Sequence, residues 1–328
     1  MIAIFLVVSF PFCSDASETD QFMVWGVELE DSAPALNGWL NEQLDEYVVE
    51  LNEDEKWLEA SIDEVTVGYY RHIFKHLLNQ KARQFLREGE GIDEYPPRDE
   101  MSVWQYQEAS VFRGRSFPYY LPMARTIRMG EVYLGTDKIG HFLGYGRRYF
   151  EKYVRHRERG MSDREAQEKT IRWGMLWELS VVGRMVDGIV SYADLEANYQ
   201  GMRMAIDMSS ESDPMFVFED GRWSTMRAID LLPYMTPDLD ESYNTNHYWL
   251  LRKRYVLPIL REEIVGRLYD ADVQARFKVY DAWEPSLNMQ YIERYLAGKK
   301  RDPRALQSLE TLYEQEYGAE RSAASEAE

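Results

Sequence analysis

Cysteine is almost absent from this chain of 328 residues, in which Cys13 is the only one. A single cysteine cannot form an intrachain disulfide, so packing and polar contacts must hold the fold. Long apolar runs are also missing, because no stretch reaches the about 18 apolar residues that a membrane helix needs. The sequence therefore predicts a protein without a transmembrane span.

Basic residues are outnumbered by acidic ones. The chain has 38 Lys and Arg against 57 Asp and Glu, which gives a formal net charge of −19. Much of the acidic surplus lies between Glu28 and Glu64, where Lys56 is the only base. Because an acidic surface repels nucleic acids and anionic membranes, we expect neither as a partner.

The signature motifs of several enzyme classes are missing too. The sequence contains no GxSxG, P-loop, GxGxxG or CxxC motif, and so offers no familiar hydrolase nucleophile, nucleotide site or redox pair. What is present is the composition of a packed globular protein, with 45% hydrophobic, 29% charged and 14% aromatic residues.

The first twelve residues are largely apolar and are followed by Ser14, Asp15 and Ala16. This stretch is too short to cross a bilayer, but it has the length of the apolar core of a secretory signal. We predict that residues 1–16 are a signal peptide and that the mature chain is periplasmic or secreted. Since no Lys or Arg precedes the apolar stretch, a buried N-terminal strand is the alternative.

Helical periodicity dominates the rest of the chain, with apolar residues recurring every three to four positions. The pattern predicts a mainly α fold, with one helical domain over residues 17–318. Alternating residues around an Asp-Gly turn predict a small β-hairpin near 215–224. The segment 239–270 is predicted to be a helix with a kink or a break at Pro258. The small and charged residues at 319–328 predict a disordered tail.

The segment 136–204 is the most informative part of the chain. A predicted helix from Thr136 to His156 places Asp137 and His141 on one face, four residues apart. Gly140 and Gly144 share this face, although glycine costs about 1 kcal/mol relative to alanine inside a helix. Small residues there indicate the close approach of another backbone or of a ligand. A polar helix start with a hydrogen-bonded histidine is the alternative.

Glu178 is the only charged residue within the apolar stretch 173–183. Because burial of an unpaired charge is costly, we expect this carboxylate to be paired, bound to a metal or protonated. Lys138, His141 and Arg184 are its candidate partners. The residue is then either half of a structural salt bridge or a general acid or base with a raised pKa.

A third group of polar residues follows Asp187-Gly188. Ser191 and Asp194 have the spacing of a helix cap, and Asp194 and Asn198 share one helix face. Asparagine is a poor residue for a helix interior, so we expect Asn198 to make a specific hydrogen bond.

Taken together, these residues resemble the pattern of VanZ-like families and of related small exported bacterial proteins of unknown function. That pattern has an acid-Lys-His helix, a helix with a lone Glu and a closing helix with Asp, Asn and Gly. VanZ proteins are embedded in the membrane, whereas the helices of this chain are too polar to span a bilayer. The resemblance implies a bacterial envelope setting and a shared polar pocket. The matching positions are Asp137, Lys138, His141, Phe142, Glu178, Asp187, Asp194, Asn198 and Gly201.

Three interpretations of this pocket follow. In the first, the chain is an exported envelope protein whose pocket binds a small polar ligand or an envelope component, or has a structural role, and Glu178 and His141 are the candidate catalytic groups. Its candidate binding residues are Asp137, Lys138, Asp187, Asp194 and Asn198. In the second, the chain is a metal-dependent hydrolase that holds a divalent metal, and its candidate ligands are Asp137, His141, Glu178 and Asp194. In the third, the residues are a polar network that only stabilises the fold.

Overall fold

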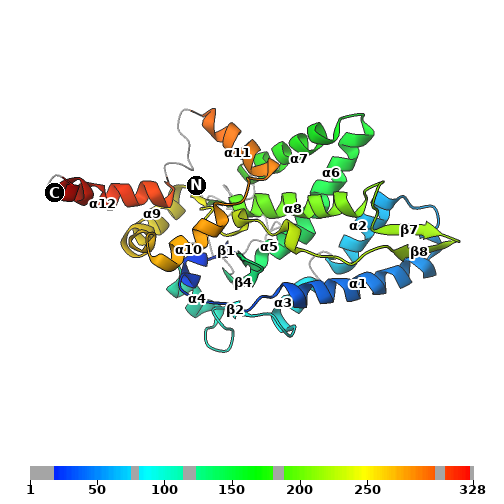
Figure 1. The fold of residues 1–328 in the computed structure, drawn as a ribbon, viewed down its shortest axis with the longest axis horizontal. Helices are drawn as coiled ribbons and strands as arrows, with labels where there is room; N and C mark the ends of the chain where they lie inside the picture. The colour runs from blue at the N-terminus through cyan, green and yellow to red at the C-terminus, as the bar shows by residue number, and fades with distance from the viewer. Residues whose placement is uncertain (1–17, 75–80, 114–122, 180–187, 300–306, 326–328) are drawn as a thin grey trace, which may run out of the picture.

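The structure, a computed structural model, describes residues 18–74, 81–113, 123–179, 188–299 and 307–325. Helices dominate these ranges and only short strands accompany them (Figure 1). The predicted mainly α fold is therefore confirmed. The predicted signal peptide at 1–16 lies outside the described residues.

Helix α8 (Tyr192–Met208) lies at the centre of the molecule and is buried along most of its length. It packs against α6 (Gly146–Glu158), α7 (Asp163–Trp177) and α11 (Leu287–Ala297), which Figure 1 shows beside it. A serine that caps α7 forms the predicted capping box with Glu165. Because α8 is covered on several sides, polar groups on it must find partners within the protein.

Glycine allows α8 to touch the segment that precedes α6. A Cβ atom on Gly201 would lie 1.9 Å from the carbonyl oxygen of Phe142, and one on Gly146 would lie 2.7 Å from the Cα of Gly201. The close approach of a backbone is thus present in the motif region. It does not involve Gly140, where nothing lies within 4 Å of the position that a Cβ would take.

The N-terminal part of the chain covers the other side of this core with helices and short strands. A three-stranded sheet in the order β2-β4-β5 joins these helices to the start of α5. The helices are α1 (Ala33–Glu53), α2 (Ile62–Ile73), α3 (Lys81–Glu88) and α4 (Val103–Ala109). The strands are β1 (Glu18–Thr19), β2 (Glu94–Tyr95), β3 (Met123–Ala124), β4 (Thr126–Met129) and β5 (Val132–Gly135).

The predicted hairpin is confirmed as β7 (Phe216–Glu219) paired with β8 (Arg222–Thr225). Asp220 and Gly221 form its turn with φ angles of 51° and 77°. Positive φ at both central residues is the geometry that an Asp-Gly turn favours.

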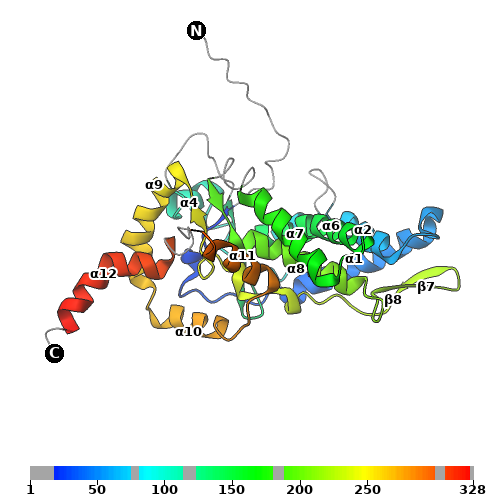
Figure 2. The same ribbon diagram turned by 90° about the horizontal axis from the view of Figure 1, so that it is seen from above.

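The C-terminal part is also helical, and α12 leads away from the helical body (Figure 2). Within the described ranges, no helix is both long and apolar enough to cross a membrane. The helices are α9 (Leu250–Ile259), α10 (Ala271–Tyr280) and α12 (Leu309–Ser325). The remaining short elements are β6 (Ile189–Val190), β9 (His247–Tyr248), η1 (Gln21–Val24), η2 (Glu55–Trp57), η5 (Leu232–Tyr234), η6 (Pro237–Leu239), η7 (Leu260–Ile264) and η8 (Val265–Arg267).

Three predicted segments need correction. The helix expected from Thr136 to His156 is interrupted, because α5 (Thr136–Gly140) passes through the π-helical segment η3 (His141–Tyr145) before α6 begins. The helix expected over 239–270 begins only at Leu250, since buried polar residues hold the preceding loop. Helix α12 runs to Ser325, so the disordered tail expected at 319–328 is wrong for residues 319–325.

Candidate functional site

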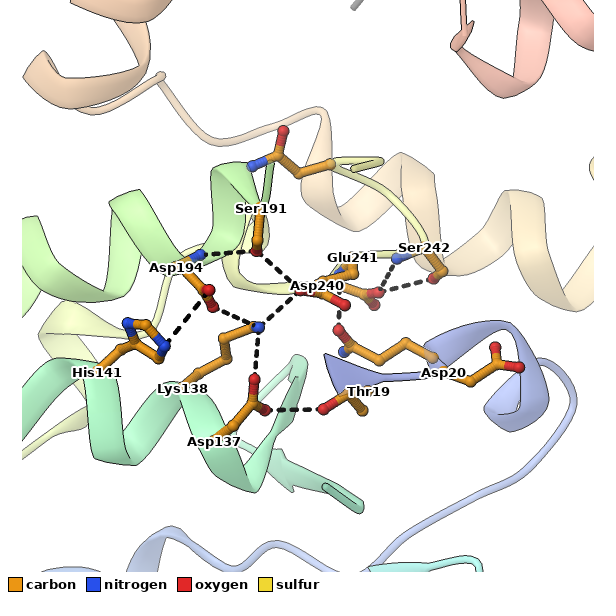
Figure 3. Close-up of polar contacts among 12 residues, drawn as sticks. Thr19, Asp20, Asp137, Lys138, His141, Ser191, Asp194, Asp240, Glu241 and Ser242 are labelled. Atoms are coloured by element: carbon orange, nitrogen blue, oxygen red, sulfur yellow. Dashed lines mark hydrogen bonds and ion pairs between the residues drawn. The ribbon is translucent and has the colours of Figure 1, made fainter. Parts of the chain in front are cut away.

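The ammonium group of Lys138 lies at the centre of the site, in contact with three carboxylates. Its Nζ is 2.7 Å from Oδ2 of Asp137, 2.6 Å from Oδ1 of Asp194 and 2.6 Å from Oε1 of Glu241. The Lys138 side chain is only 1% exposed. We call Lys138 and these three acids the Lys138 cluster, and Figure 3 shows the acids pointing toward the amine from three sides.

Four segments that are distant in the sequence meet at this cluster. Helix α5 supplies Asp137 and Lys138 from its first turn, and the first turn of α8 supplies Asp194. Glu241 comes from the loop after η6. The β1 residue Thr19 donates a hydrogen bond of 2.7 Å to Oδ1 of Asp137. The cluster therefore joins the N-terminal strand to the central helices and to the loop at 240–246.

A second layer of hydrogen bonds fixes the orientation of Glu241. Its Oε1 accepts a hydrogen bond of 2.9 Å from the hydroxyl of Ser191, which also caps α8 by accepting from the backbone N–H of Asp194 at 3.1 Å. The backbone N–H of Glu241 donates to the side-chain oxygen of Gln21 at 2.7 Å. Gln21 in turn donates to the carbonyl of Tyr133. These contacts within the chain fix the position of the Glu241 carboxylate.

The charges in the cluster shift the pKa values of its members in opposite directions. Burial alone would lower the pKa of Lys138, but Asp137, Asp194 and Glu241 raise it well above its ordinary value. Burial would raise the pKa of Asp194, but the charges of His141 and Lys138 lower it. For Glu241, burial and the two other acids outweigh Lys138 and raise the pKa to about 7. Lys138 therefore stays charged, while Glu241 takes up a proton more readily than Asp194 does.

His141 lies at the edge of the cluster. Its Nε2 is 3.4 Å from Oδ2 of Asp194, and its Nδ1 is 3.1 Å from the side-chain oxygen of Asn198. The ring stacks on Tyr145, one turn further along η3, with centroids 5.2 Å apart. Its side chain remains 12% exposed, against 1% for Lys138. His141 is thus more accessible to solvent than the ammonium at the centre. The hydrogen bond expected of Asn198 is present.

Glu178 lies at the C-terminal end of α7 and is only 8% exposed. Its charge acts on the hydroxyl of Tyr149, which is also buried. Burial raises the pKa of Tyr149, and the charges of Glu178 and Asp194 raise it further. Glu178 and Asp194 therefore act on one hydroxyl. A catalytic role for Glu178 stays a prediction.

The structure brings together most of the residues that the sequence singled out. Asp137, Lys138, His141, Asp194 and Asn198 form one connected set of polar contacts. The candidate binding residue Asp187 lies outside the described residues.

The residues present fit a divalent metal poorly, because Lys138 already occupies the space between the carboxylates. Asp137 and Asp194 each direct an oxygen at the ammonium, and the other oxygen of Asp137 accepts from Thr19. Across the part of the chain that the structure describes, no group of three or more His, Cys, Asp and Glu side chains has an arrangement suited to a metal ion. The metal ligand set of Asp137, His141, Glu178 and Asp194 stays a prediction.

Sequence reasoning missed Glu241, which contributes the third carboxylate. It lies in the polar run 240–247, which was predicted to be the start of a helix. Seven of these eight residues are buried in the structure. Asp240 shows how, because it accepts hydrogen bonds from the backbone and hydroxyl of Ser242 and from the hydroxyl of Tyr280. The signal in the sequence that could have indicated an irregular loop here is the run of eight consecutive residues without an aliphatic side chain.

Glu196 was missed as well and lies on the opposite side of α8. This carboxylate is fully buried and accepts hydrogen bonds only from neutral side chains among the contacts that the structure describes. We call this set the Glu196 cluster. Its donors are Gln200 at 2.6 Å, Thr236 at 3.1 Å, Ser286 at 2.7 Å and Asn288 at 2.9 Å.

Comparison with known proteins gives no further guide to the role of these residues. No family model, no curated protein and no solved structure matches this chain. The resemblance to VanZ-like families therefore stays a prediction from the motif residues.

Proposed function

We propose that this chain is an exported protein of the bacterial cell envelope. In it the Lys138 cluster is an ion-pair network that holds distant segments of the chain together, and we call this role the structural lock. The observation that carries the proposal is the position of the Lys138 ammonium. Its Nζ contacts one carboxylate oxygen of each of three acids at 2.6–2.7 Å. A pocket for a cationic ligand or a metal would present such oxygens to the ligand. Here the chain supplies the cation itself.

The lock holds together segments that no disulfide can join. Thr19 and Asp137 are 118 positions apart in the sequence, and Lys138 and Asp194 are 56 apart. Removing one partner of a buried ionic network leaves the others unpaired, so the contacts act together. A small polar ligand would meet this network at His141, the accessible group at its edge.

Hydrogen exchange tests the structural role. In Lys138→Met the three acids lose their common cation, so the amides of Thr19, Gln21 and Glu241 should exchange faster than in the unaltered chain. Lys278→Met is the matched control, because Lys278 is exposed on α10. Unchanged exchange at all three amides in Lys138→Met would contradict the lock and favour a binding pocket without a structural part.

Fractionation tests the envelope setting. The apolar start and the motif resemblance predict that protein recovered from the periplasm begins near Ser17. N-terminal sequencing and intact mass measure this directly. Full-length chain recovered from the cytoplasm would overturn export without affecting the lock.

A metal-dependent hydrolase is the second candidate, because three carboxylates do converge on one point. Elemental analysis of protein purified without chelators separates it from the lock. The structural proposal predicts less than stoichiometric zinc, manganese and iron. One tightly held divalent ion per chain, lost in Asp194→Asn, would favour the hydrolase instead.

A further inference from the structure

The loop at 240–246 also lines a separate pocket of about 500 Å³, which no residue of the Lys138 cluster borders. Its other walls come from η6, the end of α10, α11 with the residues before it, and the start of α12. This volume lies within the about 300–1,000 Å³ of small-molecule sites. Among the described lining residues there is no Lys, Arg or His, and we call the site the acidic pocket. Its acids are Asp238, Asp281, Glu284, Glu293 and Glu310.

Three of these acids keep a charge that no cation of the described residues neutralises. Glu284 and Glu310 are exposed and make no ion pair with those residues. Asp281, at the C-terminal end of α10, accepts a hydrogen bond of 2.9 Å from the hydroxyl of Tyr243, which is a neutral donor. The other two acids have further contacts within the chain. Three negative charges therefore remain available to a ligand of the pocket.

Thr245 adds a polar group that is independent of these charges. The residue lines the pocket although it is only 8% exposed. Its hydroxyl has no hydrogen-bond partner among the residues that the structure describes, whereas the hydroxyl of the nearby Ser242 donates to Asp240. Polar side chains at this degree of burial are normally hydrogen-bonded within the protein. The Thr245 hydroxyl is thus a binding group that an occupant of the pocket can use, and an ammonium group would supply the missing donor.

Aromatic rings form much of the remaining wall. Phe277 and Tyr280 each pack against Tyr243 at a centroid distance of 5.2 Å, so these rings hold one another in place. Trp283 differs, because it is 42% exposed and its ring has no aromatic or cationic partner in the described ranges. An indole face is the best aromatic surface for a cation, and the adjoining C-terminal end of α10 also favours positive charge.

These features favour an organic cation with several charges. No three acids of the described residues have an arrangement suited to a metal ion, so the carboxylates of the pocket do not converge on one point. One exposed ring does not form the aromatic cage that recognises a quaternary ammonium. A linear polyamine has ammonium groups separated by methylene chains, which suits separated carboxylates beside an exposed indole.

We propose that the acidic pocket binds a linear polyamine. Its ammonium groups pair with Asp281, Glu284 and Glu310, one of them donates to the hydroxyl of Thr245, and its methylene groups lie against Trp283. The inference does not depend on the role of the Lys138 cluster, because the two sites share no residue.

Calorimetric titration of the full chain with spermidine tests the proposal. We expect one saturable site whose affinity falls as sodium chloride is added, because exposed charges are screened. The variant Glu284→Gln/Glu310→Gln should bind about tenfold more weakly, since it loses two ion pairs. Glu42→Gln/Glu53→Gln is the matched control, because it removes two exposed charges from α1, outside the pocket, and should leave the affinity unchanged.

Thr245→Val separates a defined site from general attraction to an acidic surface. The substitution keeps the branched shape and the net charge and removes only the hydroxyl. The affinity for spermidine should fall about tenfold, the loss expected for one hydrogen bond to a charged group, while the melting temperature stays the same or rises. Trp283→Leu should weaken binding about threefold, as the loss of an exposed cation–π contact predicts. Unchanged affinity in both variants would show that charge alone attracts spermidine, and would overturn the proposal.

Three other cations complete the test. Magnesium chloride lacks the aliphatic part and propylamine has a single charge, so both should bind more weakly than spermidine. Failure of spermidine to bind the unaltered chain would overturn the proposal, as would equal affinity in Glu284→Gln/Glu310→Gln. Magnesium binding as tight as that of spermidine would assign the pocket to a divalent cation instead. An arginine-rich peptide that binds through Glu284 and Glu310 where spermidine does not would assign it to a protein partner and overturn the small ligand.

Discussion

Helix α8 buries two carboxylates on opposite sides and stabilises each in a different way. Asp194 and Glu196 are two positions apart, so their side chains leave the helix in nearly opposite directions. Asp194 faces an internal cation, Lys138, at 2.6 Å. Glu196 faces neutral hydroxyl and amide donors, the closest of them Gln200 at 2.6 Å. One cluster uses charge compensation and the other uses hydrogen bonds.

This difference determines how each cluster should respond to change. In the Lys138 cluster, one ammonium serves three acids, so its removal affects all of them at once. In the Glu196 cluster, four donors bind one carboxylate, so the loss of one donor leaves three hydrogen bonds. We therefore expect a single substitution to have a larger effect in the first cluster than in the second, unless it removes Glu196 itself.

Removal of the cation should have the largest effect. Lys138→Met leaves Asp137, Asp194 and Glu241 buried without their ammonium, and the free energy of unfolding should fall by about 3–5 kcal/mol. Urea denaturation at neutral pH measures the loss, and Lys278→Met is again the control. The deficit should shrink at low pH, where the acids become protonated. A loss below about 1 kcal/mol would show that the ammonium is not the common partner of the acids.

Removal of the charge on Glu196 should have the next largest effect. In Glu196→Gln the new NH₂ group can face Ser286 and Asn288. The Ser286 hydroxyl can turn and accept from it, whereas the Asn288 amide loses its carboxylate acceptor. A fall of about 1.5–3 kcal/mol follows from the loss of one hydrogen bond to a charged group. Because all four of its described donors are neutral, none of them becomes an unpaired cation, and the loss should stay below that of Lys138→Met. The same urea series compares the two variants. A larger loss in Glu196→Gln would reverse the ranking of the clusters.

The pH dependence of stability should distinguish Glu241. Its pKa is raised from the ordinary 4.5 to about 7 in the folded chain, so the folded state binds this proton more tightly than the unfolded state does. Its contribution is fully present below the unfolded pKa and is lost as pH rises through the folded pKa. Glu241→Gln cannot titrate. Its stability should therefore fall less steeply with rising pH, by up to about 1.4 kcal/mol per pH unit.

Unfolding free energies measured between about pH 5 and pH 8 test this difference. Asp20 has a pKa raised to about 6 by burial and titrates in both proteins, so it contributes equally to the two curves. The difference between the curves then reports Glu241 together with the charges of the Lys138 cluster that act on it. Parallel curves would show that Glu241 keeps an ordinary pKa in the folded chain.

The two clusters also show what the sequence could reveal. Helix caps, the hairpin at 215–224 and the shared face of Asp194 and Asn198 depend on residues a few positions apart, so local spacing predicts them. The partners of Glu196 come from separate places in the chain, and Glu241 comes from a loop with no regular pattern. Such contacts depend on tertiary packing, and periodicity contains no signal for them.

The periodicity of the sequence also did not predict the π-helical segment η3. A helical wheel assumes one constant period, so it placed Asp137 and His141 on one face as neighbours. In the structure His141 begins the wider turn and pairs with Asp194 and Asn198 of α8 instead of with Asp137. The sequence therefore singled out several residues that the structure brings into contact, but it did not predict how they pair. These residues are Asp137, Lys138, His141, Asp194 and Asn198.

Two serines allow the smallest and most closely matched test of the comparison. Ser191 caps α8 and donates to Glu241, and Ser286 caps α11 and donates to Glu196. Each serine replaced by alanine loses a helix cap worth about 1 kcal/mol. Glu241 still has Lys138 and readily takes up a proton, whereas Glu196 loses one of its neutral donors. Ser286→Ala should therefore be less stable than Ser191→Ala by about 1 kcal/mol. Ser162→Ala removes the exposed cap of α7 together with an exposed hydrogen bond to Glu165, and so gives the contribution of a cap whose carboxylate partner is in solvent. Equal losses in Ser286→Ala and Ser162→Ala would mean that the hydroxyl of Ser286 does not stabilise Glu196, and the two ways of burying a carboxylate on α8 would no longer differ in this respect.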